Sequence, residues 1–231
     1  KVISSVYGGM AATNNPEIAK KIKEFWNQCE YPSYFWIFQQ LLHPIIFAVA
    51  LPFYNILNIG KILIKLGQIF KLLSLAVVAQ EKDGKRPSYF PKRMPEALAA
   101  LALHQFKKLE YFNEHRRQLA EFYSKSINSF QFLPIYRSRT TIDTEPVFLR
   151  WTLYSSKRDE IIKTAKRRGI YLGDWYTSVV APRDTDLEKM QYIQGSCPKA
   201  EEAARRVFNL PTHINISLKD AQKITDFLNK I

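Results

Sequence analysis

The side chains that most often do metal or redox chemistry are few in this sequence and lie far apart. They are the two cysteines, Cys29 and Cys197, and the four histidines, His43, His104, His115 and His213. Zinc sites draw Cys and His ligands from short, regular spacings, and disulfide frameworks are likewise visible as spacing patterns. The sequence has neither pattern, so we expect no metal centre and no disulfide, and we expect a reducing compartment.

Basic residues are in clear excess, and this excess predicts an anionic partner. The 231 residues include 34 Lys and Arg against 21 Asp and Glu, which gives a formal net charge of +13 at pH 7. Phosphate groups, nucleic acids and acidic lipid surfaces would all satisfy this charge. The basic residues are dispersed along the chain and accompany no nucleic-acid-binding motif, so we do not expect nucleic acid to be the partner.

Segment 31–80 is the most unusual part of the sequence. Its first thirty residues contain no Asp, Glu, Lys or Arg, and a run of that length could cross a bilayer core as one helix. In the following twenty residues Lys61, Lys65, Gln68 and Lys71 form a polar stripe at helical spacing on an otherwise apolar helix. That pattern is typical of a helix lying in a membrane interface.

Basic residues flank segment 31–80 on both sides, and the positive-inside bias would hold both flanks in the cytoplasm. A re-entrant hairpin broken near Pro44 or Pro52, or a pair of crossings, would satisfy that arrangement. The alternative interpretation is a buried helical hairpin or a dimer interface, because apolar runs broken by proline also occur in protein cores. The sequence leaves these alternatives open.

The remaining patterns predict short strands and amphipathic helices. Residues 2–13 predict a hairpin around Gly8 and Gly9, and Asn14 or Asn15 is expected to cap the helix that follows. Downstream we expect a long helix from Pro95, a strand over 146–155, a helix over 157–168 ended by Gly169, a strand and turn over 170–176, a helix over 198–208, a short extended piece over 209–213 and a terminal helix over 218–231. The last third is therefore expected to be an α+β subdomain.

Four pieces of the sequence carry a resemblance to a known family. The first is a lysine followed by a short strand, a Gly-Gly turn and "T-N" before a helix, at Lys1, Gly8, Gly9, Thr13 and Asn14. The others are "YFPKRMPEALAALALHQFKKLEYFNEHRRQLAEFY", "GSCPKAEEAARRVFNLPTH" and the final helix entered through "SLKDAQKI". In this order they resemble the DegT/DnrJ/StrS type of sugar aminotransferase, a family of pyridoxal-phosphate enzymes, whose motifs include "N-x-R-M-x-E-x-x-A-A" and "C-P-x-A-E … L-P-x-H".

The resemblance implies that Lys1 is the catalytic lysine. Its amine would condense with the cofactor aldehyde and then carry the proton between carbons. The chain would then begin within a longer protein, and the sequence has neither an initiator methionine nor a signal peptide at its start. A cofactor-stacking aromatic, the Asp that pairs with the pyridine nitrogen and much of the phosphate site would precede Lys1. We therefore expect the 231-residue chain alone to be inactive.

The resemblance also assigns cofactor-binding residues. Gly8 and Gly9 would shape a turn near the cofactor, where little side-chain bulk is tolerated, although an ordinary hairpin turn would account for them equally well. Arg93 matches a family Arg that reaches the cofactor phosphate of a neighbouring subunit, and a guanidinium suits that group. The family's Asn falls on Pro91, which offers no amide and no backbone donor, so Lys92 is the candidate to replace it. Plain surface positions remain the alternative for both basic residues.

Three further residues are expected to face the substrate. His213, in "NLPTH", would approach it by analogy with the family, and Asp174 and Trp175 follow a short strand and could line a pocket. The alternative for His213 is an ordinary loop histidine, and the alternative for the other two is a packed Trp beside a solvated Asp.

Taken with the resemblance, the sequence predicts an α/β protein with an α+β C-terminal subdomain, a truncated pyridoxal-phosphate transferase of fold type I that carries an apolar helical insertion. The expected divisions are 1–30 for the end of the large cofactor-binding domain, 31–80 for the insertion, 81–130 for a connector and long helix, and 131–231 for the small C-terminal domain. The insertion would lengthen the stretch between the Gly-Gly turn and the "R-M" helix.

The expected function is that of the C-terminal portion of a pyridoxal 5'-phosphate-dependent aminotransferase acting on a keto-sugar nucleotide. The full-length protein would be a cytoplasmic homodimer that takes an amino donor and meets an anionic membrane surface through residues 31–80. The alternatives are a non-catalytic relative, suggested by Pro91, and a membrane-bound scaffold of the same fold.

Overall fold

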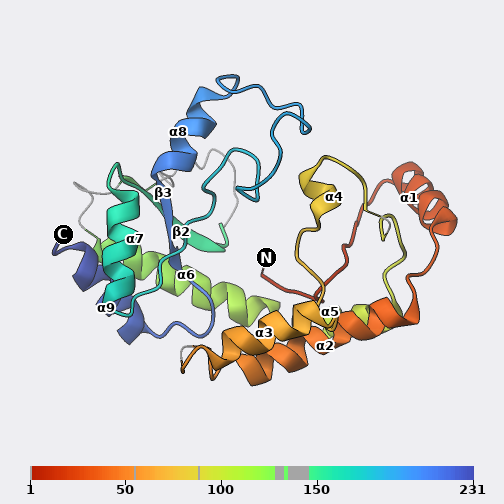
Figure 1. Cartoon of the computed structure of the whole chain (residues 1–231), viewed down its shortest axis with the longest axis horizontal. Helices are drawn as coiled ribbons and strands as arrows, with labels where there is room; N and C mark the ends of the chain where they lie inside the picture. The colour runs from red at the N-terminus through yellow and green to blue at the C-terminus, as the bar shows by residue number, and fades with distance from the viewer. Residues whose placement is uncertain (1, 55, 88, 128–132, 135–145) are drawn as a thin grey trace. The chain divides into compact units, whose positions relative to one another are not determined.

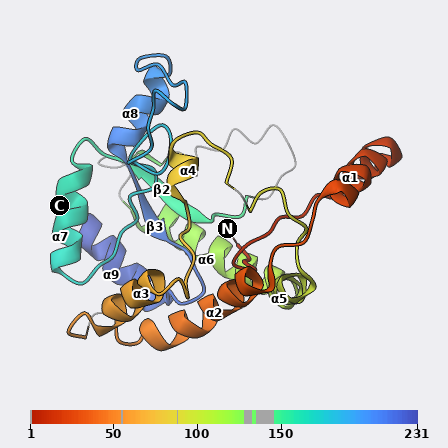
Figure 2. The ribbon, with the colours of Figure 1, turned by 45° about the vertical axis from the view of Figure 1, so that its right-hand side comes forward.

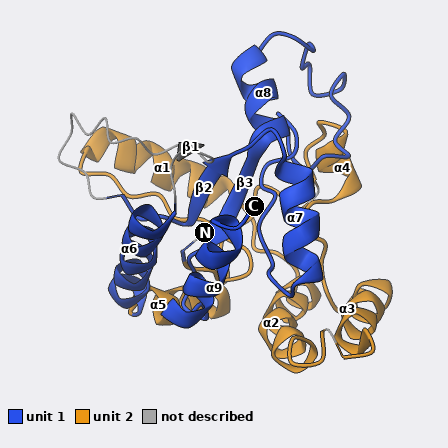
Figure 3. Cartoon of the chain, turned by 90° about the vertical axis from the view of Figure 1, so that its left-hand side faces the viewer, with its two compact units in different colours: residues 1–2, 108–231 blue, residues 3–107 orange. Residues whose placement is uncertain are grey.

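The computed structural model describes residues 2–54, 56–87, 89–127, 133–134 and 146–231 (Figure 1). The chain forms two compact units, which Figure 3 colours separately: an N-terminal unit of residues 3–107 and a C-terminal unit of residues 108–231 with Val2. The N-terminal unit contains helices α1 (Pro16–Gln28), α2 (Tyr34–Ala50), α3 (Ile59–Ile69), α4 (Ala79–Lys82) and α5 (Glu96–Phe106).

Helix α1 begins as its sequence predicts. The Asn15 side chain caps it by accepting hydrogen bonds from the backbone N–H groups of Glu17 and Ile18, and Pro16 occupies the first turn. The predicted hairpin before α1 is not formed, because residues 3–13 contain no strand. A two-stranded hairpin is marginal by itself, and the described residues offer it no third strand.

Segment 31–80 folds as a helical hairpin of α2 and α3, which Figures 1 and 2 both show lying along each other. Helix α2 runs through Pro44 and ends at Ala50, so the break expected near Pro44 or Pro52 lies at the second proline. Gly60 and Gly67 are buried, and a Cβ on Gly60 would lie only 2.1 Å from the carbonyl oxygen of Ala50. Glycine therefore lets the two helices approach closely.

No helix in the described parts of the chain has the length and apolar character that a membrane crossing needs. Helix α2 has 17 residues, which corresponds to about 26 Å, and a bilayer core is about 30 Å thick.

The long helix expected from Pro95 is divided in two. Helix α5 ends at Phe106, and α6 (Leu109–Ser126) begins after Lys107 and Lys108. The boundary between the units falls at the same place. No glycine or proline marks the break, and α5 buries Leu98 in one unit whereas α6 packs into the core of the other. Tertiary packing rather than local sequence ends the first helix.

The C-terminal unit is an antiparallel sheet covered by helices. The sheet order is β1 (Leu133–Pro134), β2 (Arg150–Tyr154), β3 (Val207–Pro211), and the register pairs Arg150 with Pro211 and Tyr154 with Val207. Helices α6, α7 (Arg158–Arg167), α8 (Pro198–Arg206) and α9 (Leu218–Leu228) complete it. This agrees with the predicted α+β arrangement, with two exceptions. Residues 170–176 contribute only a bridge between Gly173 and Asn209. The helix predicted over 198–208 ends at Arg206, and Val207 and Phe208 belong to β3.

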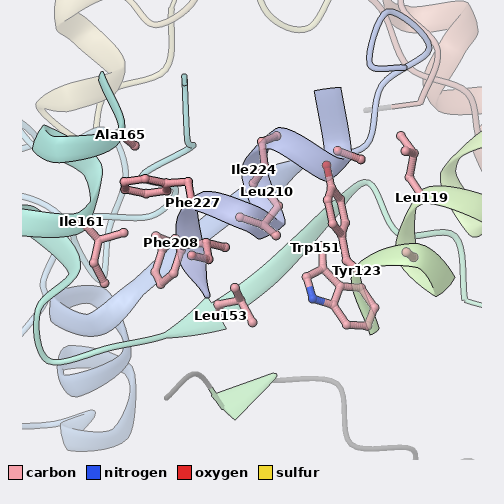
Figure 4. Packing of buried hydrophobic residues seen from close by; sticks show 13 residues of the cluster. Leu119, Tyr123, Trp151, Leu153, Ile161, Ala165, Phe208, Leu210, Ile224 and Phe227 are labelled. Atoms are coloured by element: carbon pink, nitrogen blue, oxygen red, sulfur yellow. The ribbon is translucent and has the colours of Figure 1, made fainter. Parts of the chain in front are cut away.

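The core of this unit gathers side chains from five elements. Trp151 and Leu153 alternate on β2, and they meet Phe208 and Leu210 of β3 together with apolar residues of α6, α7 and α9 (Figure 4). Gly169 ends the helical region after α7 at a φ of +72°, as the sequence predicts, while Ser217 and Asp220 form a capping box at α9. The core packs against the β2–β3 pair. Among the candidate substrate residues, Trp175 bonds to Asn209 of β3 and His213 follows the end of that strand.

Candidate functional site

The residues predicted to form the active site fall in both units. Gly8, Gly9, Lys92 and Arg93 belong to the N-terminal unit, whereas Asp174, Trp175 and His213 belong to the C-terminal unit. Lys1, the predicted catalytic lysine, lies outside the described residues. Each group is therefore considered within its own unit.

Gly8 lies against the segment that carries the predicted phosphate-binding residues. Its φ is +128°, and a Cβ at this position would lie 3.0 Å from the Sδ and Cε atoms of Met94, the neighbour of Arg93. Gly9 differs from Gly8, because a Cβ there would meet no atom within 4 Å. The structure thus gives Gly8 a backbone and packing reason to be glycine and brings the first and second family-like pieces together.

Arg93 is engaged by the end of α1. Its Nε donates to the carbonyl oxygen of Trp26 at 3.1 Å, and its Nη2 donates to that of Asn27 at 2.7 Å. The guanidinium carbon also lies 4.1 Å from the centroid of the Trp26 ring. A cation at a helix C-terminus satisfies free carbonyl groups and opposes the negative end of the helix dipole. Arg93 therefore has a structural role whether or not it binds phosphate.

Lys92 forms an ion pair instead of standing free. Its Nζ lies 2.7 Å from Oε2 of Glu30, and the hydrogen bond and charge of Lys92 lower the pKa of Glu30. In the described part of this unit, the guanidinium of Arg93 keeps three N–H groups beyond the two bonds above, and these suit a phosphate oxygen. These residues fit one edge of a cofactor phosphate site and not a complete cradle.

An aromatic cluster that the sequence did not predict holds the segment before Gly8. The Tyr7 ring lies 5.5 Å from Trp36 of α2 and 5.8 Å from Tyr89, measured between ring centroids. The Tyr7 hydroxyl donates to the carbonyl oxygen of Leu75 at 3.0 Å, and the Tyr89 hydroxyl donates to Glu81 at 2.9 Å. Burial raises the pKa of Tyr89, so its hydroxyl stays protonated. No spacing in the sequence links these three rings.

In the C-terminal unit, Trp175 is held by β2 and β3. The guanidinium carbon of Arg150 lies 4.0 Å from the centroid of its ring, and the Trp175 backbone N–H donates to Oδ1 of Asn209 at 3.2 Å. Gly173 pairs with Asn209 and leaves room for Arg150, because a Cβ there would lie 2.6 Å from Nη1 of that arginine. Trp175 remains 50% exposed, and Asp174 beside it is also exposed.

His213 lies in a cationic neighbourhood. Arg116 of α6 is buried, and its Nη1 donates to the carbonyl oxygen of Leu149 and to Oγ1 of Thr212, both at 3.4 Å. Partial burial lowers the pKa of His213, and the nearby charges of Arg116, Arg150 and His115 lower it further. Among the described residues, no carboxylate lies within ion-pair distance of Arg116 or Arg150.

This arrangement can bind an anion beside an aromatic ring. Arg150 pairs with Pro211 at the end of β2–β3, and His213 follows two residues after Pro211. Buried Arg116 acts on the charge of His213, and its Nε has no hydrogen-bond partner among the described residues. We call Arg116, Arg150, Trp175 and His213 the cationic cluster. The sequence predicted Trp175 and His213 but missed both arginines. The one available signal was Arg150, a charged residue inside the otherwise apolar run "VFLRWTLY".

Comparison with known proteins identifies one family, whose match extends over parts of both units. Residues 66–229 match the sequence model of the DegT/DnrJ/EryC1/StrS aminotransferase family. A pleiotropic regulatory protein of Geobacillus stearothermophilus is 25% identical over 153 residues, which are 62% of this chain and 40% of that protein. The matched range begins inside α3, so the predicted site residues from Lys1 to Gly9 precede it.

Two solved structures resemble the fold of about two thirds of this chain. DesV of S. venezuelae superimposes with a TM-score of 0.51 at 26% identity, over 64% of this chain and 40% of that one. DesI, solved in the presence of its TDP-sugar product, superimposes with a TM-score of 0.51 at 20% identity, over 64% of this chain and 38% of that one. The chain therefore spans about 40% of the length of the relatives it matches.

Proposed function

Because the chain belongs to the DegT/DnrJ/EryC1/StrS aminotransferase family, we propose that the full-length protein transfers an amino group, commonly from glutamate, to a keto-sugar attached to a nucleotide. The family is pyridoxal-phosphate-dependent in general. The observation that carries the substrate part is the cationic cluster, in which Arg150 stacks on the half-exposed Trp175 and also acts, with Arg116, on the charge of His213.

A nucleotide sugar matches the chemistry of that cluster. Its diphosphate carries charge that guanidinium groups bind well, and its base or sugar ring can pack on an exposed aromatic face. Arg150 covers Trp175 from one side and remains partly exposed, so it can contact a phosphate while keeping the ring in place. The structure of DesI was solved with a TDP-sugar, which is the ligand class we propose here.

The proposed cofactor is pyridoxal 5'-phosphate, which when bound supplies an aldehyde for the lysine amine and an electron sink. Lys1 would provide that amine and afterwards move the proton between carbons. Gly8 would allow the backbone to approach the cofactor, and Arg93 would offer its remaining N–H groups to a phosphate. His213 and Asp174 would face the substrate together with Trp175. Desolvation and the neighbouring cations lower the pKa of His213, which favours the neutral ring, and a neutral ring could accept a proton from a substrate hydroxyl.

We further propose that the full-length protein is a cytoplasmic homodimer whose residues 31–80 attach it to a membrane surface. The apolar helical insertion over residues 31–80 and the divisions at 30, 80 and 130 remain proposals beside the two compact units, and the family match already begins at residue 66. The rival proposal is a relative that has lost catalysis, since Pro91 occupies the position of the family's Asn.

The deciding experiment uses the full-length protein purified with pyridoxal 5'-phosphate. We expect cofactor absorbance that Lys1→Ala abolishes and that Lys20→Ala, a matched control in exposed α1, leaves unchanged. Turnover with a keto-sugar nucleotide and glutamate should follow the same pattern. A colourless wild-type protein would favour the non-catalytic relative. The 231-residue chain alone should show no turnover, and measurable activity from it would contradict the role given to missing upstream residues.

A further inference from the structure

The helical hairpin of α2 and α3 has an inverted distribution of polarity. On α2, Tyr34, Phe38, Ile45 and Val49 recur at steps of four, seven and four, so they share one helix face. All four are exposed, Tyr34 to 92% and Ile45 to 60%. A surface helix in water normally directs such residues inward, so this face is suited to apolar surroundings.

Polar groups occupy the inner side of the same helix. Gln40 is completely buried, and its Oε1 accepts a hydrogen bond from the Ser74 hydroxyl at 2.9 Å. The ring Nε2 of His43 lies 3.0 Å from that hydroxyl and accepts the Ser74 backbone N–H at 3.0 Å. Polar side chains bonded to one another inside, with apolar side chains outside, are characteristic of helices that pack within lipid.

Helix α3 repeats this pattern. Ile62, Leu66 and Ile69 recur at steps of four and three and are all exposed. The buried residues of this helix are its two glycines, Gly60 and Gly67. The outer surface of the hairpin is therefore apolar on both helices, while its inner side is formed by small and hydrogen-bonded residues.

The charges of the hairpin favour a lipid surface over a second copy of this chain as the occupant of this surface. Residues 31–80 contain no Asp or Glu, and their charged residues are Lys61, Lys65 and Lys71, all exposed. A second copy docking through the same face would bring three positive charges against three positive charges with no acid to pair them. A membrane with anionic lipids offers both the apolar phase and the opposite charge.

From these observations we propose that the outer surface of the α2–α3 hairpin lies in the interface of an anionic lipid bilayer, with Tyr34, Phe38, Ile45, Val49, Ile62, Leu66 and Ile69 among the acyl chains and Lys61 and Lys65 at the headgroups. The hairpin enters one leaflet and returns, because neither helix is long enough to cross. This inference deepens the membrane part of the proposed function and does not depend on aminotransferase chemistry.

The test is sedimentation of the full-length protein with vesicles of phosphatidylcholine, with and without 30 mol% phosphatidylglycerol. We expect binding to the anionic vesicles, and we expect Ile45→Asn combined with Ile69→Asn to weaken it at least roughly tenfold. Ile193→Asn is the matched control, because Ile193 is also an exposed isoleucine, at 75%, but lies in the C-terminal unit. Circular dichroism checks that each variant is folded.

A second set of variants tests the contribution of the lysine charges to vesicle binding. Lys61→Ala with Lys65→Ala should weaken binding to anionic vesicles by roughly 30-fold and leave binding to neutral vesicles unchanged, while Lys163→Ala with Lys199→Ala should change neither. Cofactor absorbance is recorded for every variant. Loss of cofactor binding can therefore be distinguished from loss of membrane binding. Equal vesicle binding by the wild type and the Ile45/Ile69 variant would overturn the proposal. So would dissociation of a dimer by those substitutions with vesicle binding intact.

Discussion

The guanidinium carbon of Arg150 lies 4.0 Å from the centre of the Trp175 ring, although 24 residues separate them in the chain. Because β2 carries Arg150 and the bridge of Gly173 to Asn209 anchors the segment before Trp175, the stacked pair is held by the sheet. The pair gives the C-terminal unit a positive charge and an aromatic surface at the same place.

Replacing Arg150 should therefore weaken binding of the anionic substrate. In the full-length enzyme we expect Arg150→Ala to raise the KM for a nucleotide sugar roughly tenfold or more, because a charge-assisted hydrogen bond to phosphate is lost. Steady-state kinetics with varied nucleotide sugar measures the change. Arg205→Ala serves as the control, since Arg205 is exposed on α8. An unchanged KM in Arg150→Ala would contradict the proposal that the cationic cluster binds the substrate.

The ionisation of His213 should report on the same cluster. Burial and the neighbouring cations lower the pKa of His213 below its usual value of about 6.5. A histidine whose folded-state pKa is lowered takes up its proton more readily when unfolded, so acidification below about pH 6.5 destabilises the fold. We expect wild-type stability to fall more than that of His213→Gln between pH 7.5 and pH 5.5, measured by urea unfolding.

Added anion should reverse that shift. Inorganic pyrophosphate bound between Arg150 and His213 would offset the positive charges and raise the pKa of His213, which an NMR titration of the imidazole can follow. The same titration on Arg150→Ala should show a smaller response to pyrophosphate. If pyrophosphate leaves the pKa of His213 unchanged in the wild type, the prediction of an anion site there is wrong.

Local features of the fold were predictable because their causes are local. The Asn15 cap, the first turn at Pro16 and the end at Gly169 each depend on one residue type with a fixed conformational preference, and the structure confirms all three. The strand expected over 146–155 contains β2, on which Trp151 and Leu153 are buried in alternation. For these helix ends, the residue type alone provides the physical reason for the local conformation.

Features that depend on distant partners were not predictable. The expected hairpin at residues 2–13 has suitable residues but no neighbouring strand in the described chain. The long helix is interrupted at Lys107 by packing that no local pattern records. In the candidate site, the pairing of Arg150 with Trp175 exists only once the sheet has formed. Arg93 was expected to bind phosphate, and its bonds to α1 became visible only in the structure.

Arg93 should contribute to stability as well as to any cofactor site. Removing it in Arg93→Ala frees the carbonyl groups of Trp26 and Asn27 and should destabilise the N-terminal unit by about 1–2 kcal/mol. Hydrogen exchange of the α1 amides should speed up in the absence of any cofactor. Lys92→Ala should have little effect, because its pair with Glu30 is exposed. Unaltered exchange in α1 would limit Arg93 to a cofactor role.

The two adjacent glycines should respond differently to the same substitution. Gly8 has a φ of +128°, a conformation that L-residues rarely adopt, whereas Gly9 is outside that region and has open space around it. We expect Gly8→Ala to lower the free energy of unfolding by about 1–3 kcal/mol and Gly9→Ala to change it by less than about 0.5 kcal/mol, both measured in urea.

The cause of the Gly8 effect can be separated with a second variant. The atoms that a Cβ would meet are the flexible end of Met94, which can move, so backbone strain rather than contact should dominate. The effect of Gly8→Ala should therefore be the same when measured in a Met94→Ala background. If shortening Met94 restores the lost stability, contact is the cause. Equal stabilities of Gly8→Ala and Gly9→Ala would show that this turn has no special backbone requirement, and with it the structural reason for placing Gly8 near a cofactor would be lost.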